Sequence, residues 1–338
     1  MKKHKLLTAL FALLAAALTL GVAACGGDEE NDGAESGGEA LSGEIVIDGS
    51  STVAPLSEQI AALFQEENPD VRITVGTAGT GGGFERFCAG ETDISDASRQ
   101  IEPEEEKLCA DGNVEFEEIT VANDALSVVV NPDNPVTCVS TDQLNEVYGP
   151  DSDITSWADV PDLDEPFEAE LAIFSPGADS GTFDYFSEAV NGEEGEQRRQ
   201  GINIVGENDN ATVTGVAGDE GGIGYFGFSF FNENQDQLKA LEIENEDGDC
   251  VPPAEETAQD GSYNPLGRQL YIYPSADALQ EPVVQEFVQF YLETANEVIP
   301  QAGFIGLTDE QLSDSQANVD RLLSGSGGSG GSGEETTE

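Results

Sequence analysis

The chain has 338 residues, with 68 acidic and 12 basic side chains and a formal net charge of -56. Proteins that bind nucleic acids present basic faces to the phosphate backbone, so this composition argues against a nucleic-acid partner. A surface this rich in carboxylates is typical either of a saline habitat or of a device for solubility, and both explanations stay open.

The first 24 residues have a basic start, an apolar run and small residues before Cys25, a pattern that predicts a secretory signal peptide. Residues 21–25, GVAAC, resemble a bacterial lipobox, so we expect cleavage before Cys25 and a lipid on its sulfur. The alternative is a plain N-terminal membrane anchor. The only histidine, His4, leaves with this leader, which excludes a Ser-His-Asp triad and a histidine metal ligand.

Residues 25–42 are acidic and glycine-rich and predict a tether between the lipid and the first folded segment. The signal and the tether together place the protein outside the cytoplasm, anchored to the outer face of the bacterial cell membrane. Residues 324–338, SGSGGSGGSGEETTE, predict a flexible low-complexity tail.

Strands and helices alternate in the expected elements between these ends. Apolar and β-branched runs predict strands over residues 43–49, 71–77, 119–131, 171–176, 202–206, 221–231 and 268–274. Apolar residues at helical spacing predict helices from residue 55 to the Asn68-Pro69 stop, from residue 84 to 90, over 182–192 and over 281–296. This alternation predicts an α/β protein with mainly parallel sheets.

Three segments share one design, in which a strand leads through small hydroxyl and glycine residues into a helix. They are residues 49–52, 79–83 and 179–182. Amides at a helix start are unpaired and carry partial positive charge, and neighbouring hydroxyls also donate to an oxyanion. Each segment alone is more often a simple helix cap, but their recurrence with glycine predicts an anion site built from local dipoles. No Gly-Lys-Ser/Thr follows the glycines, so the second segment is not a P-loop.

One cation and two carboxylates are candidates for the same site. Arg99 is one of few arginines, and it is expected either to clamp an anion or to pair with a carboxylate. Asp96 and Asp179 are candidate acceptors for a proton on the oxyanion, with a solvated or turn-forming aspartate as the alternative. Such an acceptor favours phosphate, which keeps a proton near neutral pH, over sulfate, which keeps none.

Three stretches, GSSTVAPLSE (49–58), GTAGTGGGFERFCAGETDISDASRQI (76–101) and GADSGTFDYFSEAV (177–190), resemble the phosphate-binding lipoprotein of the high-affinity ABC phosphate importer. The resemblance runs from about residue 43 to 323. It implies a two-lobed periplasmic-binding-protein fold of type II, with lobe one over 43–124 and 266–323 and lobe two over 125–265. A two-strand hinge near residues 122–124 and 265–268 would join the lobes.

The resemblance also implies a ligand, a partner and a set of ligand-binding residues. A monomer would close on one inorganic phosphate and deliver it to the permease subunits of an ABC transporter, without catalysis, cofactor or metal. The ligand positions that match are Ser51, Thr52, Thr80, Ser180, Gly181 and Thr182.

Two positions depart from the family pattern. Ser98 stands where well-known members have the aspartate that accepts the phosphate proton, and Pro176 stands where they have an arginine. We expect Arg99 to replace that cation and Asp179 to replace that acceptor, so Ser98, Arg99 and Asp179 complete the candidate site. The departures leave a binder of sulfate or molybdate, or a sensor or adhesin on the same fold, as the alternative. A phosphatase is less expected, because no activated base adjoins any serine.

Four cysteines follow Cys25, and an exported chain favours disulfides over zinc or redox sites where no CxxC pair occurs. Three pairings are possible. We favour Cys88 with Cys109 and Cys138 with Cys250, one bridge within each expected lobe.

Overall fold

The computed structural model describes residues 41–163, 167–178, 180–206 and 208–324. The signal peptide, Cys25, most of the tether, Asp179 and the tail beyond Ser324 therefore lie outside the described residues. Within these ranges, none of the helices combines the length and the apolarity needed to cross a bilayer.

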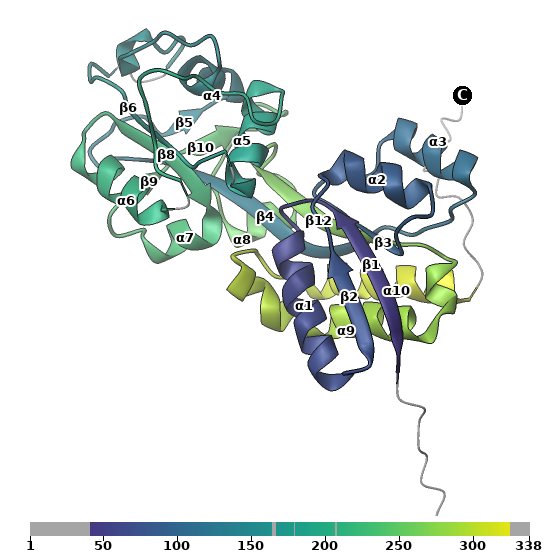
Figure 1. Cartoon of the computed structure of the whole chain (residues 1–338). Helices are drawn as coiled ribbons and strands as arrows, with labels where there is room; N and C mark the ends of the chain where they lie inside the picture. The colour runs from purple at the N-terminus through teal and green to yellow at the C-terminus, as the bar shows by residue number, and fades with distance from the viewer. Residues whose placement is uncertain (1–40, 164–166, 179, 207, 325–338) are drawn as a thin grey trace, which may run out of the picture. The chain divides into compact units, whose positions relative to one another are not determined.

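A mixed sheet of nine strands forms the centre of the described part of the chain (Figure 1). Its strand order is β2-β1-β3-β12-β4-β8-β6-β7, and β9 pairs with β4 off this path. The strands are β1 (Gly43–Gly49), β2 (Val71–Val75), β3 (Ile94–Ala97), β4 (Ile119–Val130), β6 (Ala172–Ser175), β7 (Ile202–Ile204), β8 (Gly222–Gly227), β9 (Lys239–Ala240) and β12 (Gly267–Pro274).

A smaller sheet has the order β11-β10-β5 in the described residues. It contains β5 (Cys138–Val139), β10 (Glu242–Glu244) and β11 (Cys250–Val251). Parallel pairs join β1 to β2 and β3, and β6 to β7 and β8, whereas β12 and β4 pair antiparallel with their neighbours. The expected α/β architecture is confirmed, but antiparallel pairs are as frequent as parallel pairs among the described strands.

Helices cover both ends of the large sheet (Figure 1). They are α1 (Ala54–Glu67), α2 (Thr80–Cys88), α3 (Pro103–Gly112), α4 (Thr141–Tyr148), α5 (Gly181–Asn191), α6 (Asp209–Gly218), α7 (Phe228–Glu233), α8 (Glu255–Gln259), α9 (Pro282–Val298) and α10 (Asp309–Leu323). The longest of them, α9, buries Val284, Phe287, Val288, Tyr291 and Leu292 at helical spacing, as its sequence pattern predicts.

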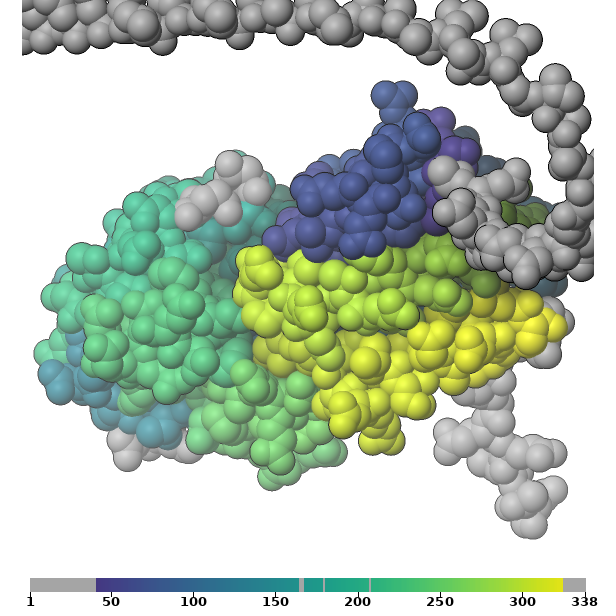
Figure 2. All heavy atoms as spheres, turned by 90° about the horizontal axis from the view of Figure 1, so that it is seen from below, coloured from purple at the N-terminus to yellow at the C-terminus, as the bar shows by residue number. Residues whose placement is uncertain are grey.

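The buried apolar side chains form two main cores. One gathers residues between 45 and 122 with residues between 270 and 322, so the two ends of the folded chain share it. The purple and yellow segments lie side by side in Figures 1 and 2 for this reason. The other core gathers residues between 125 and 266 and adds Ile305. The chain passes from one core to the other along β4 and β12, where Asp124 is paired with Arg268.

Two elements differ from their sequence predictions. The expected strand over residues 221–231 ends at Gly227, and Phe228–Glu233 forms α7, whose buried Phe228 and Phe231 join the second core. The expected turn at residues 79–83 is the first part of α2, which begins at Thr80. The glycines serve a close approach there, since a Cβ on Gly83 would lie 2.5 Å from the Cα of Gly49.

Candidate anion-binding site

The first segment, residues 49–52, turns sharply between β1 and α1. Gly49 has a φ of 144°, and a Cβ at this position would lie 2.1 Å from the backbone oxygen of Asp96, so only glycine fits. The Ser50 hydroxyl oxygen accepts hydrogen bonds from the amides of Thr52 at 3.2 Å and Val53 at 3.4 Å. Ser50 therefore caps the turn, while the exposed Ser51 and the half-buried Thr52 face the cavity described below.

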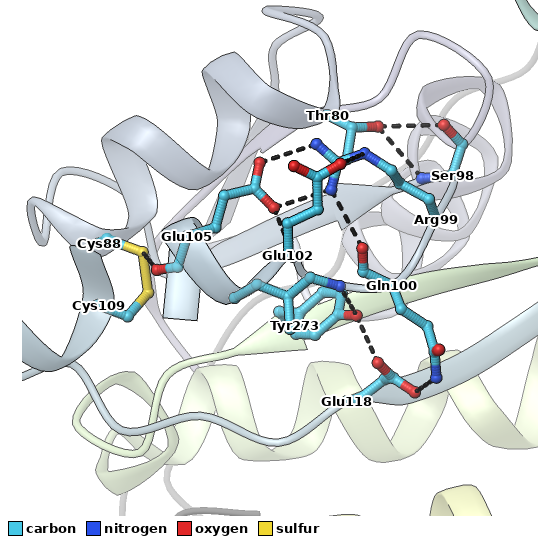
Figure 3. Close-up of polar contacts among 11 residues, drawn as sticks. Thr80, Cys88, Ser98, Arg99, Gln100, Glu102, Glu105, Cys109, Glu118 and Tyr273 are labelled. Atoms are coloured by element: carbon cyan, nitrogen blue, oxygen red, sulfur yellow. Dashed lines mark hydrogen bonds and ion pairs between the residues drawn. A yellow bond between two sulfur atoms is a disulfide. The ribbon is translucent and has the colours of Figure 1, made fainter. Parts of the chain in front are cut away.

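The second segment, residues 76–83, is fixed to the end of β1 by Asp48. The buried Asp48 carboxylate accepts the Ala78 amide at 2.9 Å and forms an ion pair with Arg86 of α2. Thr80 begins α2, and its hydroxyl oxygen lies 3.1 Å from that of Ser98 and accepts the Ser98 amide at 3.2 Å (Figure 3). The structure therefore brings two of the expected hydroxyl ligands together, although they are 18 residues apart in the chain.

The third segment supplies the start of α5, with Ser180 as its cap residue. A Cβ on Gly181 would lie 3.4 Å from the hydroxyl oxygen of Thr52, so the third segment lies against the first. Ser180 is 6% exposed. Ser180, Gly181 and Thr182 do not themselves line the cavity, and Asp179 is outside the described residues.

A small polar cavity of about 90 Å³ lies among these segments. Five of the predicted site residues line it, namely Ser51, Thr52, Thr80, Ser98 and Arg99. It adjoins a wider cavity of about 320 Å³, with which it shares Ser98, Arg99, Tyr185, Glu188 and Arg268. Hydroxyl groups, helix-start amides and guanidinium groups suit a small oxyanion.

Arg99 satisfies both interpretations that its sequence position allows. It lines the cavity, and its Nη1 and Nη2 atoms each lie 2.8 Å from an oxygen of Glu105, with Nε 3.3 Å from Glu102 (Figure 3). Glu105 raises the pKa of Arg99 through this bidentate contact. Arg99 therefore enters the site with its charge already balanced.

A second cation, Arg268 of β12, was missed as a site residue by the sequence analysis. Its Nη2 donates to the Thr52 hydroxyl at 3.1 Å, and its Nε lies 3.3 Å from Asp124. The guanidinium carbon lies 3.4 Å from the ring centroid of Tyr185 in α5, which is cation–π geometry. The scarcity that singled out Arg99 applies equally to Arg268, whose neighbours in β12 are largely apolar.

The sequence analysis also missed three carboxylates that line the cavity, Asp184, Glu188 and Glu194. Burial raises the pKa of Asp184 to about 6, with further increases from the nearby Glu194 and Glu188 and an opposing effect of Arg268. An acidic residue in the first turn of a helix that begins at an anion site is the signal that could have revealed Asp184.

Asp96, a candidate proton acceptor, does not line the cavity. Its side chain is fully buried near Ser57 of α1, and burial raises its pKa to about 7. Alternation along β3 puts Asp96 on the same side of the strand as Ile94, toward the first core.

Both favoured disulfides are present in the structure. Cys88 and Cys109 join the ends of α2 and α3 (Figure 3), and Cys138 and Cys250 join β5 to β11. The first bond holds the far end of the helix that begins at the cavity. In the described part of the chain, no group of three or more His, Cys, Asp or Glu side chains is arranged to hold a metal ion.

A mixed sheet with two cores and three helix starts around a small polar cavity defines a solute-binding protein of the periplasmic type. Residues 34–294 match the PBP superfamily domain of the PBP_like_2 family. The chain is 43% identical over 269 residues to protein SphX of Synechococcus elongatus, covering 78% of this chain and 77% of SphX. It is 36% identical over 318 residues to the phosphate-binding protein PstS of Staphylococcus saprophyticus, covering 93% and 94%.

A solved structure supports the same assignment. The crystal structure of a possible phosphate binding protein from Planctomyces limnophilus is 36% identical, has a TM-score of 0.78, and is matched over 84% of this chain and 99% of that one. The chain belongs to the PBP superfamily and, within it, to the family that includes PstS and SphX.

Proposed function

We infer that this protein is an extracytoplasmic solute-binding protein that captures inorganic phosphate and delivers it to an ABC importer. One observation carries the inference most directly: hydroxyls from Thr52, Thr80 and Ser98 and two guanidinium groups line one small polar cavity. Relatives matched over nearly their whole length are named as phosphate-binding proteins, which favours phosphate over sulfate, molybdate or a separate role in sensing or adhesion.

The proposed ligand set is Ser51, Thr52, Thr80, Ser98, Arg99, Asp179, Ser180, Gly181 and Thr182, with Arg268 added. The contact between Gly181 and Thr52 supports including the third segment, because it brings the α5 start next to a cavity residue. Arg268 supplies the cation that Pro176 does not, since its guanidinium lies between Thr52 and Tyr185.

We propose that lobe one comprises residues 43–124 and 266–323, that lobe two comprises residues 125–265, and that the protein acts as a monomer. The two cores support this division, because they separate near residues 122–125 and 266–270. Closure of the lobes would be accommodated at Asp124 and Arg268, which face each other in β4 and β12. No bond is made or broken in this function.

The site assignment is tested with Ser51→Ala combined with Thr182→Val. Each substitution removes a hydroxyl that would donate to a charged ligand, so phosphate affinity should fall by several kcal/mol, at least about 100-fold. The matched control, Ser313→Ala with Thr214→Val, removes the same groups from exposed positions on α10 and α6. Calorimetric titration that finds unchanged phosphate affinity in the first variant would refute the assignment.

We also propose that Cys25 becomes the lipidated N-terminus of the mature protein. The basic, apolar and small-residue order of the leader supports this proposal. Labelled palmitate should enter the protein in a bacterial host, and Cys25→Ala should abolish the label. Incorporation that survives this substitution would show that the lipid, if any, is elsewhere.

A further inference from the structure

The part of the anion site that carries Thr80, Ser98 and Arg99 is built over a third, small core. Its buried members come from α2, α3, β3 and β12 and are Phe84, Phe87, Cys88, Ala97, Cys109, Tyr271 and Tyr273. Among the described residues, no buried side chain of α2 or α3 belongs to either main core. The positions of α2 and α3, and of the site residues beside them, therefore depend on contacts within this small core.

The helix α3 has little apolar surface with which to hold its place. Among its ten residues only Cys109 is buried and only Glu105 is half-buried, whereas the others, including Leu108, are exposed to solvent. A short helix gains most of its stability from a packed face. Glu105 and Cys109 are four residues apart, so they lie on the same face of the helix. These two side chains are therefore the main attachments of α3.

Glu105 holds Arg99 at the cavity. Its two carboxylate oxygens each accept one hydrogen bond from the guanidinium at 2.8 Å, and Oε2 also accepts the Glu102 amide at 2.9 Å (Figure 3). A planar guanidinium that is bound at two points has a fixed orientation. Among these described contacts Nη2 gives one of its two N–H groups to Glu105, so the other can donate to an anion. Glu105 therefore sets the direction in which Arg99 presents this donor.

The start of α2 lies beside the pair of Arg99 and Glu105. A Cβ on Gly81 would lie 3.8 Å from a Glu105 carboxylate oxygen and 4.0 Å from Nη2 of Arg99. The preceding residue is Thr80, whose hydroxyl oxygen lies 3.1 Å from that of Ser98. The two hydroxyls and the guanidinium therefore share one support, which is formed by the starts of α2 and α3.

The Cys88–Cys109 disulfide joins the other ends of the same two helices. Cys88 is the last residue of α2, and its Sγ lies 3.5 Å from the backbone oxygen of Glu105 (Figure 3). A Cβ on Gly112 of α3 would lie 2.0 Å from the backbone oxygen of Cys88, so the two helices approach very closely there. The crosslink therefore fixes α3, and Glu105 with it, relative to the α2 start at Thr80.

We propose, resting on the phosphate-binding function inferred above, that Glu105 is a positioning residue of the anion site and that the Cys88–Cys109 disulfide holds it in place. Glu105 lines neither the small cavity nor the wider one, so it acts through Arg99. Binding to a donor that is already ordered loses less conformational entropy than binding to a free arginine side chain. The disulfide thus supports the affinity for phosphate as well as the stability of the fold.

The role of Glu105 is tested by comparing Glu105→Gln with Glu102→Gln. Both variants remove one negative charge from beside Arg99, but only the first removes the two-point contact, since Glu102 lies 3.3 Å from Nε and is 55% exposed. Calorimetric titration of the full mature protein should give a phosphate Kd at least about tenfold higher in Glu105→Gln than in Glu102→Gln. Equal Kd values in the two variants would overturn the positioning role.

The disulfide is tested with Cys88→Ala and Cys109→Ala against the matched control Cys138→Ala and Cys250→Ala. The two bridges have sequence separations of 21 and 112, so the chain-entropy account predicts the larger loss of stability in the control. Phosphate affinity should change in the opposite order, because Kd should rise at least about fivefold in the first variant and stay within about twofold in the control. An affinity loss that follows the loss of stability, or none in the first variant, would contradict the role of the disulfide.

Combining the changes tests whether the disulfide acts through Glu105. Adding Glu105→Gln to the variant without the Cys88–Cys109 bridge should raise Kd by clearly less than the product of the separate increases, because both changes loosen the same contact. A fully multiplicative increase would show that the two act independently. If the variant without the bridge does not fold, Gly112→Ala takes its place, since this substitution keeps the bridge but pushes α3 away from Cys88.

The outcomes separate this proposal from the proposed function. A wild-type protein that does not bind phosphate contradicts the function itself. A protein that binds phosphate, and loses affinity in the Ser51 and Thr182 variant, but binds equally well without Glu105 or the Cys88–Cys109 bridge contradicts only the support by α3.

Discussion

Replacing Arg268 with glutamine should lower both the free energy of unfolding and the phosphate affinity, because this side chain joins three parts of the fold. It contacts Thr52 before α1, Asp124 in β4 and Tyr185 in α5. The substitution leaves the Asp124 carboxylate, which is 7% exposed, without its cation. Breaking a buried pair by removing one partner costs about 3–5 kcal/mol of the free energy of unfolding.

The loss of folding stability in the Arg268→Gln variant should depend on pH in a defined direction. Burial raises the pKa of Asp124 and Arg268 opposes that rise, so removing Arg268 should raise the pKa further. A carboxyl whose pKa is higher in the folded state contributes stability below its unfolded pKa, and this stability is lost as pH rises through the folded pKa. The stability deficit of the variant should therefore be largest near neutral pH and should shrink as the pH falls toward about 4.

Phosphate affinity should fall as well, since the variant loses a charge-assisted donor in the cavity. A contribution of about 2–3 kcal/mol corresponds to roughly a 30- to 150-fold increase in Kd. Denaturant unfolding without phosphate measures the first effect, and calorimetric titration of the folded variant measures the second. Asp124→Asn in the same background should recover part of the stability by removing the uncompensated charge.

Arg321→Gln is the matched control. It removes a guanidinium that is ion-paired with Glu117, but Arg321 is 46% exposed on α10 and outside the cavity. Exposed pairs of this kind contribute about 0–1 kcal/mol. If Arg268→Gln behaved like this control in both assays, Arg268 would be neither the cation of the site nor a structural link between its parts.

Three further outcomes follow from the structure. Gly49→Ala should abolish phosphate binding and lower Tm by several degrees, because its Cβ would lie 2.1 Å from the Asp96 oxygen; normal binding would show that the first segment relaxes. Asp96→Asn should flatten the pH dependence of the free energy of unfolding. Burial raises the pKa of Asp96 to about 7, so the wild type loses up to about 4 kcal/mol of this free energy as pH rises from about 4 through 7. Equal slopes of stability against pH in the variant and the wild type would count against this. Phosphate should associate faster as ionic strength rises, because salt screens the net negative field; a stopped-flow rate that falls with salt would contradict it.

The parts of the fold that the sequence predicts well are those specified by local patterns. The α1 and α9 helices follow from apolar spacing and from Pro55 and Pro282 near their starts. Residues 221–231 were predicted less well, because an aromatic run fits a buried strand and a buried helix equally, and packing against the second core decides between them after Gly227.

The candidate site likewise contains residues that local sequence patterns predict and residues that they do not. Its hydroxyl residues lie in short segments whose glycines and small side chains are visible as motifs. Arg268 reaches Thr52 from 216 residues away and lies in an ordinary strand, so no local pattern marks it. Asp184 could be placed at a helix start, but the presence of Glu194 in the same cavity depends on how the chain returns after α5. Sequence patterns therefore indicate the donors of the site better than the charges around them.

The balance of these charges explains how so acidic a chain can hold an anion. Each guanidinium of the cavity is matched by a carboxylate that orients it, so neither supplies a net attraction at long range. The attraction must act at short range, through hydroxyls, helix-start amides and the hydrogen-bond donors of the paired guanidinium groups, well inside a Debye length of about 8 Å. Affinity can then be set at the site while the distant carboxylates govern only the rate of approach.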